Sequence, residues 1–221
     1  LEMYQVGKAF LESEGFRQVT PYDFERTGPL PSTYLYEQLF RQPFQDNDGQ
    51  PIGYDAWGWG FAGISFFFGT PDSPGSAYMN HVHVDQYFRD IDANRFPILR
   101  GYQYTAIDLR LHLLFQELQG LTVDRRRYAS LFGCDVIDEH NPIWNTLDEL
   151  GWASIDNNFI SIEGNGAFYL PLIQNMLAHD RSEVMRKQRT TVSQPSPPST
   201  SVTTPQLPED VARAVVTARA S

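Results

Sequence analysis

A run of alternating glycine and aromatic residues constrains the fold of this 221-residue chain more than any other feature. Residues 57–65 read WGWGFAGIS and belong to a stretch, residues 27–76, that is rich in glycine, proline, asparagine and aromatic side chains. Glycine lets a backbone approach its neighbours closely, and aromatic rings supply large flat surfaces. The run therefore predicts either a buried Gly-rich strand or a backbone wall against a planar ligand. Long stretches without regular structure are usually functional or disordered, and the aromatic content argues against disorder.

The residues before this stretch predict a helix followed by a strand. Apolar residues recur at helical spacing and Gly15 stands where a left-handed C-terminal cap would lie, so residues 2–14 are predicted to be helical. Residues 16–24 have the composition of a strand, which Pro21 interrupts. A helix, a glycine and a strand form half of a βα repeat, the unit of α/β folds. Because Leu1 already lies inside the amphipathic pattern, we expect this helix to begin further upstream.

Beyond Asp85 the pattern becomes densely helical. Apolar residues at helical spacing predict one helix over residues 84–91. Thr105 followed by Asp108 has the spacing of a capping box and predicts the start of a second helix, which Gly120 ends. Four apolar residues of the second helix are predicted to share one face: Ile107, Leu111, Leu114 and Leu118.

Further helices and one hairpin complete the predicted C-terminal module. Thr122 is predicted to cap a third helix that runs toward Phe132, and a fourth helix is predicted to end at Gly151. Residues 156–158 (Asp-Asn-Asn) separate two apolar runs and predict a β-hairpin, which a helix over residues 168–177 follows. Three helices, a hairpin and a further helix describe a winged-helix-like module.

Charge argues against the nucleic-acid binding that winged helices often perform. The chain carries a formal net charge of −10, and residues 105–180 contain four basic and eleven acidic residues. Binding to a phosphate backbone or to an anionic membrane surface depends on surplus cationic charge. We therefore expect neither a nucleic acid nor a membrane among the partners of this chain.

Cysteine usage and hydropathy limit the chemistry and the location of the chain. Cys134 is the single cysteine. It can form no internal disulfide, complete no zinc-finger set and hold no iron-sulfur cluster, which needs three or four thiolates. The most apolar stretch, residues 61–69, is far shorter than the roughly 20 residues of a membrane-spanning helix. We expect a cytoplasmic protein in which Cys134 is a small buried apolar residue.

Several segments, taken in order, carry a resemblance to a known family. They are GFRQVTPYDFER at residues 15–26, WGWGFAGIS at 57–65, AYMNHVHVDQYFRDIDANRFPILRG at 77–101, and the helical module. Over roughly residues 1–180 the chain resembles the C-terminal part of the oxygen-independent coproporphyrinogen III oxidase family of radical SAM enzymes. The relatives of that family act in porphyrin biosynthesis, haem trafficking, haem-ring opening and methyl transfer.

The resemblance implies four regions of an α/β (α+β) fragment. Residues 1–26 would be the last helix and strand of a partial βα barrel, and residues 27–84 a Gly/Pro/aromatic segment that closes the barrel. Residues 85–187 would form the winged-helix-like C-terminal domain. The Ser/Thr/Pro-rich residues 188–221 predict a disordered tail, in which residues 209–220 have the pattern of a short helix.

The resemblance also implies cofactors. In that family a four-iron four-sulfur cluster reduces S-adenosylmethionine to a 5′-deoxyadenosyl radical, which abstracts hydrogen from a propionate side chain of the porphyrinogen. The cluster ligands lie in a Cys-x-x-x-Cys-x-x-Cys loop of the N-terminal barrel half, and that loop is not in this chain. The missing barrel half is therefore an implied partner, and the chain alone is expected to be inactive.

Candidate cofactor and substrate residues follow from the same resemblance. Ile64, flanked by Gly63 and Ser65, corresponds to the hydrophobic residue of a G-x-x-A-I-S-like segment that lies at a second S-adenosylmethionine. The end of the first predicted strand matches a D-H-F-A-R-like pattern, in which Asp23 replaces the histidine of the oxidases. The residues expected to bind a tetrapyrrole or another planar substrate are Arg26, Trp59, Asn80 and His81.

Further residues suit a radical site on chemical grounds. Apolar and aromatic side chains would exclude water from it, and the candidates are Trp57, Trp59, Phe61 and Phe66 to Phe68. Arginines suit the propionates of a tetrapyrrole, and the candidates are Arg26, Arg41, Arg95 and Arg100. The alternative for these arginines is an ordinary surface position.

His81 and His83 raise the question of a metal, because alternate residues of a strand point the same way and two imidazoles would share an ion. No third ligand lies nearby in the sequence, so a metal site is not expected. Two functions stay open. One is the C-terminal part of a radical SAM enzyme, which covers the active site. The other is a stand-alone module that binds a tetrapyrrole or a protein without catalysis.

Overall fold

The computed structural model describes residues 1–28, 44–45, 51–52 and 55–192. The chain divides into two compact units, Leu1–Val184 and Met185–Ser221. Of the second unit the structure describes only the last part of helix α9 (His179–Val192), which continues through residues 188–192 of the predicted tail. The predicted helix over residues 209–220 and the candidate ligand Arg41 lie outside the described residues, as does most of the stretch from 29 to 54.

The first unit opens with a helix and a two-stranded hairpin. Helix α1 (Glu2–Ser13) ends before Gly15, whose φ of +81° is the predicted left-handed conformation. The single strand predicted over residues 16–24 is wrong, because the chain forms β1 (Phe16–Gln18) and β2 (Phe24–Arg26), which pair antiparallel. Thr20 makes the reversal: its hydroxyl accepts hydrogen bonds from the N–H groups of Tyr22 and Asp23.

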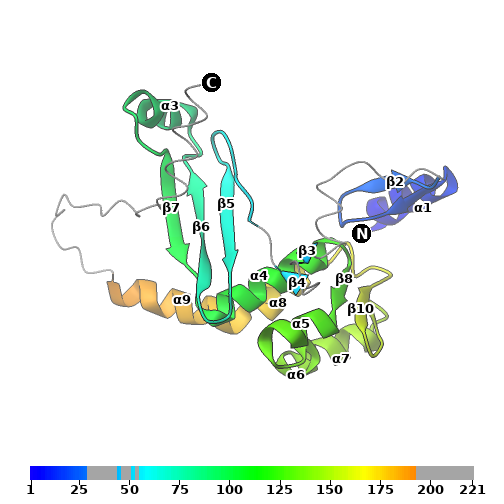
Figure 1. Cartoon of the computed structure of the whole chain (residues 1–221). Helices are drawn as coiled ribbons and strands as arrows, with labels where there is room; N and C mark the ends of the chain where they lie inside the picture. The colour runs from blue at the N-terminus through cyan, green and yellow to red at the C-terminus, as the bar shows by residue number, and fades with distance from the viewer. Residues whose placement is uncertain (29–43, 46–50, 53–54, 193–221) are drawn as a thin grey trace. The chain divides into compact units, whose positions relative to one another are not determined.

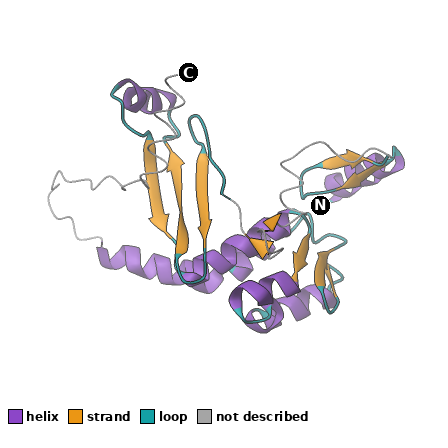
Figure 2. Cartoon of the chain, in the orientation of Figure 1, coloured by secondary structure: helices purple, strands orange, loops and turns teal. Residues whose placement is uncertain are grey.

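A three-stranded antiparallel sheet follows the Gly-rich run (Figures 1 and 2). Its order is β5 (Ile64–Gly69), β6 (Pro74–Asn80) and β7 (Ile98–Gln103). Helix α3 (Val84–Asp92), which was predicted, connects β6 to β7 at one end of the sheet. Two short strands earlier in the chain, β3 (Phe44–Gln45) and β4 (Pro51–Ile52), pair with each other.

The C-terminal part of the first unit is mainly helical. Its elements, in chain order, are α4 (Ala106–Gln119), β8 (Thr122–Asp124), α5 (Arg125–Phe132), α6 (Val136–Glu139), α7 (Asn141–Glu149), β9 (Ala153–Ile155), β10 (Phe159–Ile162) and α8 (Leu170–Leu177). The three strands form an antiparallel sheet in the order β8-β10-β9, so the predicted hairpin is confirmed. The predicted Thr122 cap is wrong: Thr122 lies in β8, and Asp124 caps α5 by accepting from the N–H groups of Arg126 and Arg127.

The fold class is mixed helix and sheet with small antiparallel sheets. Among the residues that the structure describes, every strand pair is antiparallel. The α/β expectation, which needs parallel strands, is therefore not met in this part of the chain, and the α+β alternative describes it.

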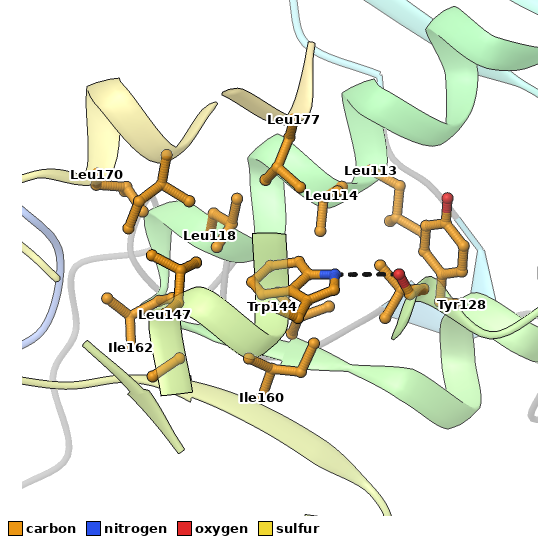
Figure 3. Packing of buried hydrophobic residues seen from close by; sticks show 14 of the residues in the cluster. Leu113, Leu114, Leu118, Tyr128, Trp144, Leu147, Ile160, Ile162, Leu170 and Leu177 are labelled. Carbon is orange, nitrogen blue, oxygen red and sulfur yellow. Dashed lines mark hydrogen bonds between the residues drawn. The ribbon is translucent and has the colours of Figure 1, made fainter. Parts of the chain in front are cut away.

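The buried core gathers around helix α4 (Figure 3). The Thr105 capping box is confirmed, with the Asp108 N–H donating to the Thr105 hydroxyl. The single apolar face predicted for this helix is wrong in part, because Ile107 is 56% exposed whereas Leu109 and Leu113 are fully buried. The helix contacts β5 and β6 as well as β8 and α8, so it is buried on more than one side.

Trp144 of α7 fills the centre of the core, and its indole N–H donates to the carbonyl of Val136 at 3.0 Å (Figure 3). Within the described part of the chain, no helix has the length and the apolar character needed to cross a membrane.

Candidate functional site

The Gly-rich loop, which we define as residues 57–63, connects an isolated pairing at Ala56 to strand β5. Before the loop, Ala56 exchanges two backbone hydrogen bonds of 2.9 Å with Phe66 of β5. Within the loop, the N–H of Gly58 donates to the hydroxyl of Ser65 at 3.0 Å. Ser65 is only 1% exposed, so the hydroxyl of this candidate cofactor residue is buried and holds the loop backbone.

Two glycines of the loop pack backbone against backbone. A Cβ atom on Gly63 would lie 2.7 Å from the carbonyl carbon and oxygen of Gly58, and a Cβ on Gly58 would clash with the backbone of Ile64. These contacts exclude any side chain at either position. The close approach is thus made within the loop itself, and a backbone wall against a planar ligand stays a prediction.

Asn80, the last residue of β6, ties the loop together. Its side-chain amide donates to the carbonyls of Gly58 at 3.2 Å and of Gly60 at 2.8 Å. Its own N–H donates to the carbonyl of Gly63 at 2.9 Å. Asn80 is 7% exposed, and its amide N–H groups are used inside the protein.

His81 follows Asn80 and connects the loop to α3 and to the segment before β7. Its carbonyl accepts from the N–H of Ala62, and its N–H donates to the carbonyl of Pro97, both at 2.8 Å. Its Nε2 lies 3.0 Å from a carboxylate oxygen of Asp90, while its buried Nδ1 has no hydrogen-bond partner. The Arg95 guanidinium, hydrogen-bonded to the same carboxylate, lowers the pKa of Asp90 below its usual range.

The two histidines do not share a strand face. His83 lies at the N-cap position of α3, beyond the end of β6. In the described ranges, no three His, Cys, Asp or Glu side chains are grouped so that they would hold a metal ion.

Large apolar side chains are exposed on and beside the loop. Trp59 is 81% exposed, Phe61 55% and Ile64 58%. Trp57 packs its ring edge-on against Phe67 with a centroid distance of 5.2 Å. The loop is therefore no buried strand: a hydrogen-bonded backbone carries an aromatic and aliphatic surface into solvent.

The predicted aromatic cover divides into two groups. The loop residues are exposed, but Phe66 and Phe68 of β5 pack against His112 of α4, with ring centroids 4.5 Å and 5.8 Å away. Phe68 is 4% exposed and belongs to the core. These two phenylalanines therefore join the sheet to α4 and are not on the loop surface.

Six of the seven candidate site residues meet at this loop. They are Trp59, Gly63, Ile64, Ser65, Asn80 and His81. Arg26 lies instead in the β1–β2 hairpin, where its guanidinium is 4.7 Å from the centroid of the Phe16 ring. Asp90 was missed by the sequence analysis, since the eight residues between it and His81 include a helix start whose direction no pattern specifies.

A second polar cluster lies in a cavity of about 450 Å³ lined by residues of β1, β8 and β10. Here Arg127 donates to the Glu117 carboxylate at 3.0 Å, and the Asp124 N–H donates to its other oxygen at 3.0 Å. Burial raises the pKa of Glu117 to about 7, against the opposing influence of Arg127. Both carboxylate oxygens are satisfied within the protein, as expected of a structural ion pair.

A larger cavity of about 970 Å³ lies among α4, α7, α8 and the first turns of α9. Its walls include the exposed apolar residues Ile107, Leu172 and Val184. At its base the Glu139 carboxylate accepts from Arg110 and from the hydroxyl of Tyr128. Glu139 is therefore already paired within the protein, and the Gly-rich loop, with its exposed aromatic surface, is the stronger candidate site.

Comparison with known proteins supports a relationship at the level of fold. No protein-family model matches the sequence, and no curated protein matches it significantly. Among solved structures the chain is similar to coproporphyrinogen III oxidase from Escherichia coli, a radical SAM enzyme, with a TM-score of 0.55 and 18% sequence identity. The match covers 79% of this chain and 39% of the oxidase, so this chain spans about two fifths of that structure. The chain therefore has a fold like that of part of a radical SAM enzyme.

Proposed function

We propose that this chain is the C-terminal portion of a radical SAM enzyme related to oxygen-independent coproporphyrinogen III oxidase. In this proposal it covers the active site and helps to bind a tetrapyrrole or a similar planar substrate. The observation that carries the proposal is the Gly-rich loop, where a backbone held by Asn80 presents Trp59 and Phe61 to solvent beside the exposed Ile64 of β5. Flat apolar surfaces that are fixed in advance suit a planar ligand, because little conformational entropy is lost on binding.

The first helix supports the idea that further chain packs on this unit. Helix α1, described over its whole length, contains no buried residue. Met3 is 88% exposed, Val6 66% and Phe10 63%. In the proposal, α1 and the β1–β2 hairpin are the last part of a partial βα barrel, and the N-terminal barrel half is the partner that covers this apolar surface.

The C-terminal elements fit the winged-helix-like assignment. Helix α4, strand β8, helices α5 and α7, and strands β9 and β10 follow one another, and β10 pairs between the other two strands. Arg125, the first of three consecutive arginines in α5, is paired with Asp135 at 2.6 Å. Together with the acidic composition, this favours a structural role for the module over DNA binding.

The residues of this chain fit the two implied cofactors differently. A four-iron four-sulfur cluster does not fit, since Cys134 is the single cysteine and no cluster loop is present. S-adenosylmethionine fits better, because Ile64 offers an exposed apolar contact beside Gly63. The cofactor would supply radical chemistry, while this chain would hold the substrate, exclude water and keep the reacting atoms close.

A stand-alone tetrapyrrole-binding or protein-interaction module is the second candidate. The observation in its favour is the completeness of the helical core, in which Leu113, Trp144 and Ile160 are fully buried. A region with such a core is expected to fold without a partner.

The test uses the complete gene product from which this chain comes, reconstituted anaerobically with iron and sulfide. We expect formation of 5′-deoxyadenosine, and we expect Trp59→Ala and Ile64→Ala to slow porphyrinogen turnover at least about tenfold at unchanged iron content. Leu150→Ala, at a residue that is 54% exposed on the helical part, is the matched control. A gene product that binds coproporphyrin but never cleaves S-adenosylmethionine would support the stand-alone module instead.

A further inference from the structure

The Asn80 side chain uses both hydrogens of its amide on carbonyls of the Gly-rich loop, at distances of 3.2 Å and 2.8 Å. These carbonyls, of Gly58 and Gly60, flank Trp59, the most exposed aromatic residue of the loop. The Asn80 main chain adds a third bond to the loop at Gly63. One residue therefore fixes the loop on both sides of the indole that it presents.

Only a side chain with two donors in one plane meets this geometry. A serine or threonine hydroxyl has one hydrogen, and an aspartate carboxylate would place oxygen against two carbonyl oxygens. Because Asn80 is 7% exposed, water replaces its amide poorly, and the loss of the amide leaves two carbonyls without their donors.

We propose that Asn80 is a positioning residue, whose amide holds the Gly-rich loop in the shape that binds ligand and makes no contact with the ligand itself. His81 assists through its main chain, which joins Ala62 to Pro97. The Ser65 hydroxyl accepts a hydrogen bond from the Gly58 N–H at 3.0 Å. The loop is thereby a prebuilt surface that needs no ligand to take its shape. That Asn80 holds the loop is inferred from these contacts alone. That the loop binds a planar substrate rests on the function proposed above.

The first experiment measures the loop without any ligand. Hydrogen exchange is followed by mass spectrometry in peptides covering residues 57–64, and peptides of helix α4 in the same sample report overall stability. Asn80→Asp and Asn80→Ala are expected to speed exchange in the loop roughly tenfold, as loss of two hydrogen bonds implies, while α4 is unchanged. Asn157→Asp, on the exposed β9–β10 turn, is the matched control and is expected to change neither.

Two outcomes would overturn the positioning role. Unchanged exchange in the loop would show that the amide does not hold it, and equal acceleration in the loop and in α4 would show that Asn80 merely stabilises the whole unit. Ser65→Ala provides a milder variant in case the Asn80 variants unfold. It removes a single acceptor and is expected to speed exchange at Gly58 a fewfold with α4 again unchanged.

The second experiment adds a ligand, with coproporphyrin III as the probe and quenching of tryptophan fluorescence as the signal. Asn80→Asp is expected to weaken binding about tenfold, and Trp59→Ala is expected to weaken it similarly without changing exchange in the loop. A mobile loop that binds the probe with undiminished affinity would refute a planar-ligand function at this site and leave the holding of the loop intact. A rigid loop with weakened binding would instead make Asn80 a direct contact and overturn the positioning role.

Discussion

The helical region, residues 104–177, and the region before it differ sharply in how they bury apolar side chains. All but two of the buried hydrophobic residues among the described ranges belong to the helical region, the exceptions being Val19 and Phe68. Helices α1 and α3, both fully described, contribute none. Both regions have amphipathic helices, so amphipathicity alone does not determine burial.

The difference shows which region builds the core, although the helical region also leaves Ile107, Leu150 and Leu172 exposed. In the helical region, α4 contacts strands β5, β6 and β8 and helix α8. The exposed apolar residues before it, such as Phe10 and Trp59, lie on elements that present a face or a loop to solvent. Exposed apolar surface of this kind marks ligand or protein contact, which is where the proposed function places these residues.

The largest expected effect separates the two regions directly. Trp144→Ala should lower the free energy of unfolding by about 3–5 kcal/mol, because it empties the centre of the core and leaves the Val136 carbonyl without its donor. Trp59→Ala, with 81% of the residue already in water, should change it by less than about 0.5 kcal/mol. Urea denaturation followed by circular dichroism measures both. Equal losses would remove the distinction between the regions.

The next effect tests the contact between the regions at His112. This α4 residue packs against Phe66 and Phe68, and burial lowers its pKa to about 4 from the usual 6.5. Between pH 4 and pH 6.5 the unfolded chain therefore binds more protons than the folded chain. The stability that comes from burying neutral His112 is complete above pH 6.5 and is lost as the pH falls toward 4.

The size of this loss for His112 is on the order of 3 kcal/mol at most between pH 7 and pH 4. His112→Leu should remove this part of the pH dependence, as measured by urea denaturation at each pH. An unchanged slope in the variant would mean that His112 is accessible to protons in the folded state.

A smaller effect concerns the start of α4. Asp108 completes the capping box and accepts two hydrogen bonds from Arg181, at 2.7 Å and 2.9 Å. Asp108→Ala should cost about 1–2 kcal/mol, since the helix loses its capping partner and Arg181 loses its acceptor. Asp148→Ala, at an exposed position of α7, is the control and should be nearly neutral. Thermal unfolding compares the two, and similar melting temperatures would argue against a role for the capping box.

The smallest effect on stability is expected at α1. Phe10→Ser should alter the free energy of unfolding by less than about 0.5 kcal/mol, because the residue is 63% exposed. It should nevertheless reduce self-association of the chain in sedimentation velocity, whereas Leu150→Ser on the helical region should not. A marked loss of stability in Phe10→Ser would show that α1 is packed in solution, contrary to its exposure here.

Local signals in the sequence predicted the helices well. The Thr105 capping box, the positive φ at Gly15 and the hairpin at residues 156–158 all depend on neighbours a few residues away, and the structure confirms each. The strand predicted over residues 16–24 failed because Pro21 and the Thr20 hydroxyl favour a reversal, and composition does not register this. Thr122 failed as a cap because pairing with β10, a partner almost forty residues away, makes it part of a strand.

The candidate site was predicted in part for the same reason. The run WGWGFAGIS, which indicates close backbone packing and a flat surface, holds four of the seven candidate site residues, and Asn80 and His81 join these four at the loop. Arg26 does not join them: it lies in β2 beside the Phe16 ring. The sequence around an arginine in a strand does not indicate which distant residues it will contact. The Asn80 amide and the Asp90 carboxylate owe their roles to hydrogen bonds between elements that sequence spacing cannot pair.

The sequence by itself determined the position of several helices, such as α1, α3 and α4, the left-handed turn at Gly15, and that one cysteine excludes an internal cluster. These properties follow from backbone sterics, capping and composition, which act locally. The tertiary structure alone decided which side chains are buried and which hydrogen bonds are used. Solvation and long-range pairing depend on the whole fold. Leu109 is therefore buried while Ile107 is exposed, and the Asn80 amide is hydrogen-bonded to the Gly-rich loop.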